Sequence, residues 1–217
     1  MDKQLLAKSI IRANVEQCEK QFGHDNNYHQ PVQQMRNITL KNITQLDVYM
    51  IVENYLYTWG RMGRVLGRDK YSGWQKKLAT NIRTFQAKLE DFRSCELSTV
   101  ELSEYQVDIK TLYNSLNSII GPIASAKVLH IICPNFFPLW DNGIADGLRA
   151  EYSGVNELKP FSAQDYFEFM KIIQSLLRKY DELWSSLSKS YNKGKLKIID
   201  ECLWHIVRYP FSLIVSS

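Results

Sequence analysis

Long apolar runs are absent from this sequence. No stretch of the 217-residue chain approaches the roughly 20 consecutive apolar residues that span a bilayer. The N-terminal segment interrupts its apolar positions with charged residues, unlike the apolar core of a signal peptide. We therefore expect a cytoplasmic protein that is neither exported nor embedded in a membrane.

Cysteine is scarce, and its four positions are widely spaced. None of Cys18, Cys95, Cys133 and Cys202 has a second cysteine at the spacing of metal ligands. We therefore expect reduced thiols in the core, with no metal and no iron–sulfur cluster. The sequence also lacks a Gly-Lys-Ser/Thr phosphate loop, a dinucleotide fingerprint and a serine-hydrolase elbow, so we predict no cofactor.

Strand signals are missing as well, and helical periodicity replaces them. Apolar residues recur at three- and four-residue steps, which is the period of a buried helix face. The composition, 45% hydrophobic and 12% aromatic, is that of a chain with a well-filled core. We predict one all-α domain over residues 1–217 with about eight helices.

Capping and turn residues give the expected helix boundaries. Gly23–Pro31 is predicted to be a turn, and Ser98 with Glu101 has the spacing of a capping box. The expected helices are Lys3–Phe22, Thr44–Val65, Tyr71–Phe92, one from Ser98 that breaks before Thr111, a short one ending at Ile120, Ile123–Ile132, Asn142–Tyr152, Ser162–Leu187 and Leu196–Arg208.

The segment from Ser118 to Asp141 carries the clearest chemical pattern. A helix ends at Gly121-Pro122, and the next begins with small residues that let two helices pack closely. Backbone N–H groups at the N-terminus of that second helix are suited to bind phosphate. Asp141 follows Phe-Pro-Leu-Trp at the start of another helix, where a carboxylate either caps the helix or takes part in chemistry.

These residues resemble the helix-hairpin-helix DNA glycosylase superfamily over about Thr111–Glu151, with the hairpin at about 111–132. The resemblance implies that double-stranded DNA is the partner and that a base is flipped into a pocket. It also implies that Asp141 stabilises the positive charge that develops as the glycosidic bond breaks. The hairpin residues that it assigns to DNA binding are Ile120, Gly121, Ile123, Ala124, Ser125 and Lys127.

Three positions depart from the pattern of that family. Trp140 stands between Pro-Leu and Asp141, which shifts the carboxylate by one residue. Ile119 stands where the first of two hairpin glycines is usual, and Ile123 stands where members with lyase activity carry a Schiff-base lysine. Lys127 lies a full helical turn beyond that position. The resemblance therefore implies a monofunctional N-glycosylase, acting on a modified or mispaired base without lyase activity.

A basic region from Tyr57 to Arg93 is the second candidate for function. It holds nine basic and three acidic residues, a local charge of +6 against +4 for the whole chain. Arg61, Arg64 and Arg68 have the spacing of one helix face. The region is therefore either a surface that grips the phosphate backbone or a solvated helix face with its aromatic residues turned inward.

Several aromatic residues have two interpretations. Trp140, Phe137, Tyr57 and Trp59 either line a base pocket by stacking or fill the core. His130 lies on an apolar helix face and is either a core residue or a functional one. For the whole protein, two alternatives to an enzyme remain: an inactive nucleic-acid-binding module of the same fold, and a protein-interaction module whose basic face binds an acidic partner.

Overall fold

A computed structural model describes residues 3–22, 26–145 and 162–208 of the chain. These residues are helical and contain no strand, which confirms the all-α prediction. They include twelve α-helices, more than the eight expected. The difference arises because the structure divides long helices that the apolar periodicity had suggested were continuous.

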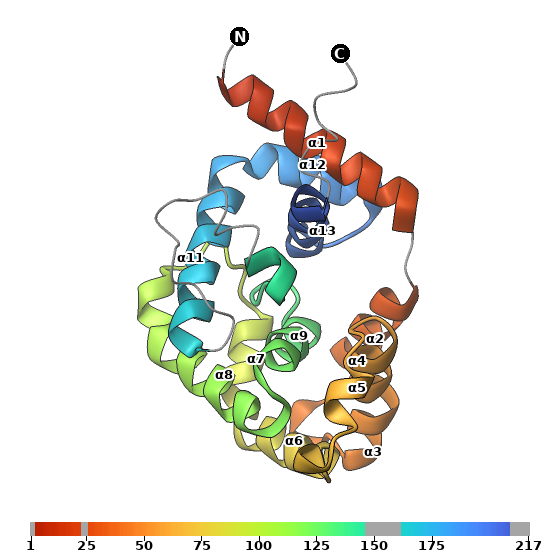
Figure 1. Cartoon of the computed structure of the whole chain (residues 1–217). Helices are drawn as coiled ribbons and strands as arrows, with labels where there is room; N and C mark the ends of the chain where they lie inside the picture. Colours follow the sequence, from red (N-terminus) through yellow and green to blue (C-terminus); the bar gives the residue numbers. More distant parts are fainter. Residues whose placement is uncertain (1–2, 23–25, 146–161, 209–217) are drawn as a thin grey trace.

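The first and last described helices pack against each other. Helix α1 (Lys3–Phe22) has the predicted bounds and lies along α13 (Lys195–Arg208), with α12 (Asp181–Tyr191) beside them (Figure 1). Asn14 of α1 and His205 of α13 form a buried side-chain hydrogen bond of 2.6 Å. The N-terminal helix therefore closes the fold against the C-terminal helices.

The segment between α1 and the hairpin is a series of short helices. Figure 1 shows α2, α4 and α5 together on one side of the molecule, with α3 and α6 at the bottom. Their bounds are α2 (Asn26–Arg36), η1 (Leu40–Asn42), α3 (Gln45–Asp47), the π-helix η2 (Val48–Glu53), α4 (Asn54–Thr58), α5 (Gly63–Leu66), η3 (Asp69–Tyr71), α6 (Trp74–Thr84) and α7 (Gln86–Arg93).

Two predictions in this region are wrong. The turn expected over Gly23–Pro31 is replaced from Asn26 onward by α2, which contains Pro31. The helix expected over Tyr71–Phe92 is instead two helices, divided at Phe85, whose φ of −101° and ψ of 14° leave the helical range.

The helix predicted over Thr44–Val65 starts as expected but ends early. Thr44 and Asp47 form a capping box at its start. The chain leaves the helix after Thr58, and a Cβ at Gly60 would lie 2.7 Å from the Leu56 carbonyl oxygen. Arg61 then has φ +52°, in the left-handed region. This break prevents Arg61, Arg64 and Arg68 from sharing one helix face.

The helical hairpin is present and lies at the centre of the fold. Helices α8 (Gln106–Ile120) and α9 (Pro122–Ile132) pack side by side (Figure 1). Every residue of α9 from Ala124 to Ile132 is buried. Helix α8 begins after a short 3-10 turn, η4 (Leu102–Tyr105), so the predictions of a helix start at Ser98 and a break before Thr111 are both wrong.

The C-terminal predictions are confirmed in part. The Ser162 hydroxyl oxygen accepts the Asp165 N–H and caps α11 (Ala163–Lys179), as expected. The single helix predicted through Leu187 is divided at Tyr180, beyond which α12 begins. Of the helix expected from Asn142, the first four residues are helical, and the part after residue 145 lies outside the described residues.

The hairpin turn gives a testable prediction. Gly121 has φ +80° and ψ 167°, a region that only glycine occupies readily, and a Cβ there would meet the Tyr71 hydroxyl at 3.0 Å. We expect Gly121→Ala to lower the free energy of unfolding by about 2–3 kcal/mol. Gly73→Ala is the matched control, because Gly73 has φ +68° but open space around its Cβ position. It should cost only about 1 kcal/mol. Equal losses of unfolding free energy in Gly121→Ala and Gly73→Ala, measured by urea denaturation, would contradict the steric argument.

Candidate functional site

A cavity of about 350 Å³ lies where the hairpin turn meets the break after α4. Its volume falls at the lower end of the range of small-molecule sites. Most of the lining side chains are aliphatic, and the charged ones are Lys127 and Asp141. The full lining is Met62, Val65, Tyr71, Ile120, Gly121, Pro122, Ile123, Lys127, Asn142, Asp141 and Gly143.

Lys127 is the buried cation of this cavity. The residue is 8% exposed, and its Nζ donates a hydrogen bond to the Gly60 carbonyl oxygen at 3.0 Å. The same nitrogen lies 5.4 Å from the ring centroid of Trp59. Burial lowers the pKa of the Lys127 amine, while the carboxylates of Asp141 and Asp200 oppose that shift. The resemblance assigned Lys127 to DNA binding, and the structure shows a buried amine.

Asp141 caps a helix and also lines the cavity. Its Oδ1 accepts the Ile144 N–H at 3.0 Å, so the carboxylate does cap a helix. The residue is also half-buried and lines the cavity with Lys127, so the cap does not remove it from the site. A carboxylate in such a partly desolvated position interacts with charge more strongly than it would in water.

The hairpin turn forms one wall of the same cavity. Ile120, Gly121 and Ile123 line it. Pro122 has no N–H, and Ala124 is fully buried, so Ile123 is the first-turn residue of α9 that carries an amide and also lines the cavity.

The position of Ser125 argues against its predicted contact with DNA. It is fully buried, and its hydroxyl donates to the Gly121 carbonyl oxygen at 2.7 Å. The Ala124 side chain is buried too. The small size of both residues serves close packing of the hairpin helices, so we assign neither side chain to the nucleic-acid interface.

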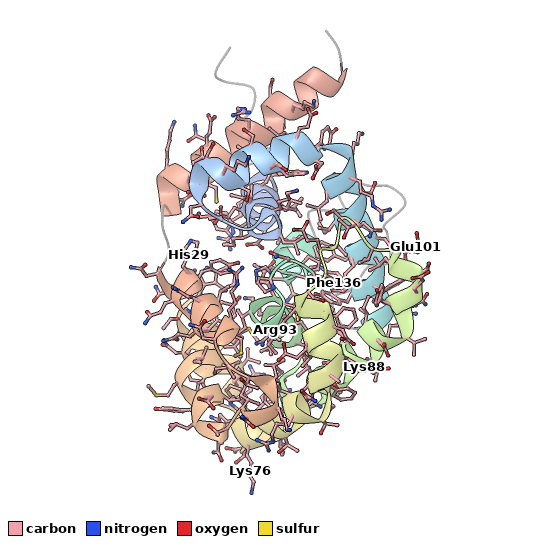
Figure 2. The ribbon with its side chains drawn as sticks, turned by 180° about the vertical axis from the view of Figure 1, so that it is seen from behind. His29, Lys76, Lys88, Arg93, Glu101 and Phe136 are labelled. Atoms are coloured by element: carbon pink, nitrogen blue, oxygen red, sulfur yellow. The ribbon has the colours of Figure 1, made fainter. Side chains whose placement is uncertain are left out.

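The basic region divides into exposed and structural residues. Arg61, Arg64 and Arg68 are exposed, and the Arg61 guanidinium is close enough to Lys127 to lower the pKa of that amine further. Arg93 instead donates to the carbonyl oxygens of Met35, Ile38 and Ile132 at 2.8, 3.0 and 3.2 Å. The Arg93 side chain is only 15% exposed, whereas Lys76 points away from the molecule in Figure 2. The local charge of +6 therefore overstates the charge available to a partner.

The predicted base pocket of aromatic side chains is wrong for this cavity. Trp140 and Phe137 are fully buried, and neither lines the cavity. Trp140 stacks on Phe169 at 4.9 Å between ring centroids, which fixes the loop after α9 against α11. Tyr57 is 37% exposed and does not line the cavity either. The physical reason is that the apolar loop after α9 folds inward, where burying its large rings is most favourable.

Trp59 lies behind the cavity between two lysines. Its ring stacks on Tyr55 and lies 5.4 Å from the Lys127 Nζ and 4.7 Å from the Lys197 Nζ. Lys197 comes from α13 and forms a 2.9 Å ion pair with Asp200. The sequence gave no sign that Lys197 contacts Trp59, because α13 is distant in the chain and its charged residues resemble those of a surface helix.

His130 is a core residue, one of the two interpretations left open by the sequence. Its two ring nitrogens lie 2.7 Å from the Phe137 carbonyl oxygen and 2.7 Å from the Tyr28 hydroxyl. The carbonyl can only accept, so Nδ1 carries the proton and Nε2 accepts from Tyr28. Burial lowers the pKa of His130 to about 3, which keeps the ring neutral.

Comparisons with protein-family models, curated proteins and solved structures found no match for this chain. In the described part of the chain, no group of three or more histidine, cysteine or acidic side chains is placed to hold a metal ion. The same part contains no helix long and apolar enough to cross a membrane. The candidate site therefore has to be interpreted from its own geometry.

His130 generates a prediction about acid stability. Its pKa is about 3 in the folded chain and 6.5 in the unfolded one, so only the unfolded state gains a proton as the pH falls through this window. The contribution of the neutral ring is complete above pH 6.5 and is progressively lost as the pH falls toward 3. We expect a loss of about 2 kcal/mol between about pH 7 and pH 5. The free energy of unfolding of His130→Gln, measured by urea denaturation, should depend less steeply on pH across that range than that of wild type. Equal pH dependence in the two proteins would refute the assignment of this loss to His130.

Proposed function

We propose that this chain is a DNA-binding protein of the helix-hairpin-helix glycosylase type that acts as a monofunctional N-glycosylase on a modified or mispaired base. One observation carries the proposal: the hairpin turn, Lys127 and Asp141 line a single cavity. A cavity of about 350 Å³ with mostly aliphatic walls suits one extruded base. The sequence resemblance and the cavity point to the same residues through independent arguments.

The chemistry assigned to the cavity is hydrolysis of a glycosidic bond. The C1′–N bond breaks, its electron pair leaves with the base, and positive charge develops on the sugar. The Asp141 carboxylate is the group that would stabilise this charge, at a half-buried position where electrostatic stabilisation is strong. Water then bonds to C1′ and loses a proton, while the departing base gains one.

Binding of the duplex is assigned to the exposed arginines and the hairpin turn. Arg61, Arg64 and Arg68 are exposed, and they are near neighbours in the sequence of Met62 and Val65, which line the cavity. We assign them to contacts with the phosphate backbone. The amides at the start of α9 provide a further phosphate contact. Affinity for duplex DNA should therefore fall as salt concentration rises.

Two observations are compatible with a protein that is not an enzyme. The Asp141 cap alone would account for a carboxylate at this position, which favours a binding module of the same fold without chemistry. Leu46, Tyr49 and Met50 are 66%, 55% and 59% exposed on α3 and η2, which favours a surface that contacts another protein. Both alternatives predict no release of any base.

The decisive experiment is incubation of wild type and Asp141→Asn with duplexes that each carry one damaged, modified or mispaired base. Abasic sites are measured by strand cleavage in alkali. We expect wild type to release at least one base, and Asp141→Asn to be slower by about 100-fold or more, because the carboxylate charge is lost while the side-chain shape is kept.

Asp47→Asn is the matched control, because the Asp47 carboxylate also accepts a backbone N–H at a helix start, that of Thr44 in a capping box, but lies outside the cavity. It should retain wild-type activity. No product from wild type, combined with salt-sensitive duplex binding by both Asp141 forms, would replace the enzyme with the binding module. Loss of both product and binding would leave the protein-interaction alternative.

Lys127 tests the assignment as monofunctional. An amine with a lowered pKa in a cavity beside a carboxylate is a possible nucleophile, yet this one is already hydrogen-bonded to Gly60 and lies against Trp59. We therefore expect no covalent protein–DNA adduct when borohydride is added during turnover. An adduct that forms with wild type and disappears in Lys127→Met would overturn the monofunctional assignment and identify Lys127 as a Schiff-base residue.

A further inference from the structure

Three large apolar side chains form an exposed ridge on α3 and η2. Leu46, Tyr49 and Met50 are 66%, 55% and 59% exposed, and none of them lines the cavity. Tyr49 and Met50 belong to the π-helix, a rare form of helix that often occurs at functional sites. Together the three side chains expose on the order of 300 Å² of apolar surface, a size at which such patches are often functional. We call these three residues the apolar ridge.

Basic side chains of α6 border the apolar ridge. Helix α6 runs antiparallel to α3 and η2. Near its start, Gln75 donates to the Glu53 carboxylate at 2.6 Å, and near its end, Arg83 donates to the Ile43 carbonyl oxygen at 2.6 Å. Lys76 stands two helical turns before Arg83, so both side chains occupy the face of α6 that lies beside the ridge. Both residues are exposed.

The acidic side chains of the same surface are already engaged. Asp47 Oδ2 accepts the N–H and the hydroxyl of Thr44 at 2.8 and 2.7 Å. Glu53 accepts the bond from Gln75. The apolar ridge therefore has a cationic border, and it is complementary to a partner whose apolar group is flanked by carboxylates.

The chain carries such a surface itself, in residues 94–109, which we call the acidic segment. The segment contains four acidic residues and no basic one. Val107, in the first turn of α8, is 75% exposed. Glu104 stands three residues before it and is also exposed. An apolar side chain with a neighbouring carboxylate thus lies on the surface of α8 and η4.

Two basic residues approach the acidic segment from elsewhere in the fold. Lys88 of α7 forms an ion pair with Asp108. Arg178 of α11 donates to two backbone carbonyl oxygens of the segment, at 2.9 and 2.7 Å. The segment keeps an acidic surface beyond these contacts, because its glutamates are all exposed. They are Glu96, Glu101 and Glu104.

We propose that the apolar ridge of one copy of this chain binds the acidic segment of a second copy, head to tail. The basic border then faces carboxylates, and the ridge covers Val107. A symmetric contact between two ridges is disfavoured, because it brings the basic borders of both copies together. Figure 2 shows Glu101 on the opposite side of the molecule from the orange helices that include α3, so the contact joins two copies rather than two parts of one.

The small area of the ridge makes this contact weak. It offers less than half of the area, about 800 Å², that each partner buries in a standard interface. We expect a Kd on the order of 100 µM at about 50 mM salt, and a higher one at about 500 mM, because salt screens exposed charges. Each dimer keeps one uncovered ridge and one uncovered acidic segment, so longer assemblies form as the concentration rises.

Sedimentation velocity of the purified chain tests the association, from about 10 µM to about 1 mM protein and at both salt concentrations. We expect the weight-average mass to rise from that of one chain toward two or more, and to rise less at high salt. A mass that stays at one chain throughout would overturn the proposal. An association that salt leaves unchanged would overturn it as well.

Single substitutions assign the contact to its two surfaces. Lys76→Glu and Glu104→Lys should each raise the Kd by about tenfold or more. Lys77→Glu is the matched control and should associate like wild type, because Lys77 is exposed on a different face of α6. Met50→Ser should weaken association at both salt concentrations, because salt does not screen apolar contact. All four positions are exposed, so urea denaturation should show unchanged folding. Equal effects of Lys76→Glu and Lys77→Glu would overturn the proposed contact.

A mixture of two variants tests the head-to-tail arrangement. Lys76→Glu keeps an intact acidic segment, and Glu104→Lys keeps an intact ridge and basic border. The equimolar mixture should therefore form dimers with a Kd close to that of wild type, but no longer assemblies. Each variant alone should stay at the mass of one chain at concentrations where the mixture pairs. Association in the mixture that is no stronger than in either variant alone would overturn the arrangement, and a symmetric contact between ridges predicts that result.

Discussion

The hydrogen bond from Lys127 to the Gly60 carbonyl oxygen is the contact on which the candidate site depends. A buried amine needs an acceptor, because an unpaired polar group inside a protein is costly. The chain supplies that acceptor by leaving the helical path after Thr58. The contact thus ties the break after α4 to the central helix α9, and the cavity lies between the two.

Glycine makes this arrangement possible at both walls. At Gly60 a side chain would collide with the Leu56 carbonyl oxygen, and at Gly121 the backbone takes values that other residues avoid. One glycine lets the chain turn away from α4, and the other lets α8 turn directly into α9. The cavity is therefore a consequence of two tight turns rather than of a gap left by poor packing.

Charge around the cavity is arranged in layers. Lys127 lies in the wall, Trp59 lies behind it, and Lys197 with Asp200 lies beyond, on α13. Helix α13 also packs against α1, so the two ends of the described chain lie together (Figure 1). Arg61, Arg64 and Arg68, by contrast, are exposed in and around α5.

The sequence by itself determined the helical class, the hairpin and its turn, and the position of Asp141 at a helix start. These follow from local patterns: apolar periodicity, a Gly-Pro turn and a capping residue. Only the tertiary structure decided that Lys127 is buried, that Trp140 and Phe137 belong to the core, and that Arg93 holds backbone carbonyls. The reason is that a side chain's environment depends on which distant helices cover it. Periodicity shows that a residue faces inward or outward, but only packing shows whether inward means a filled core or a cavity.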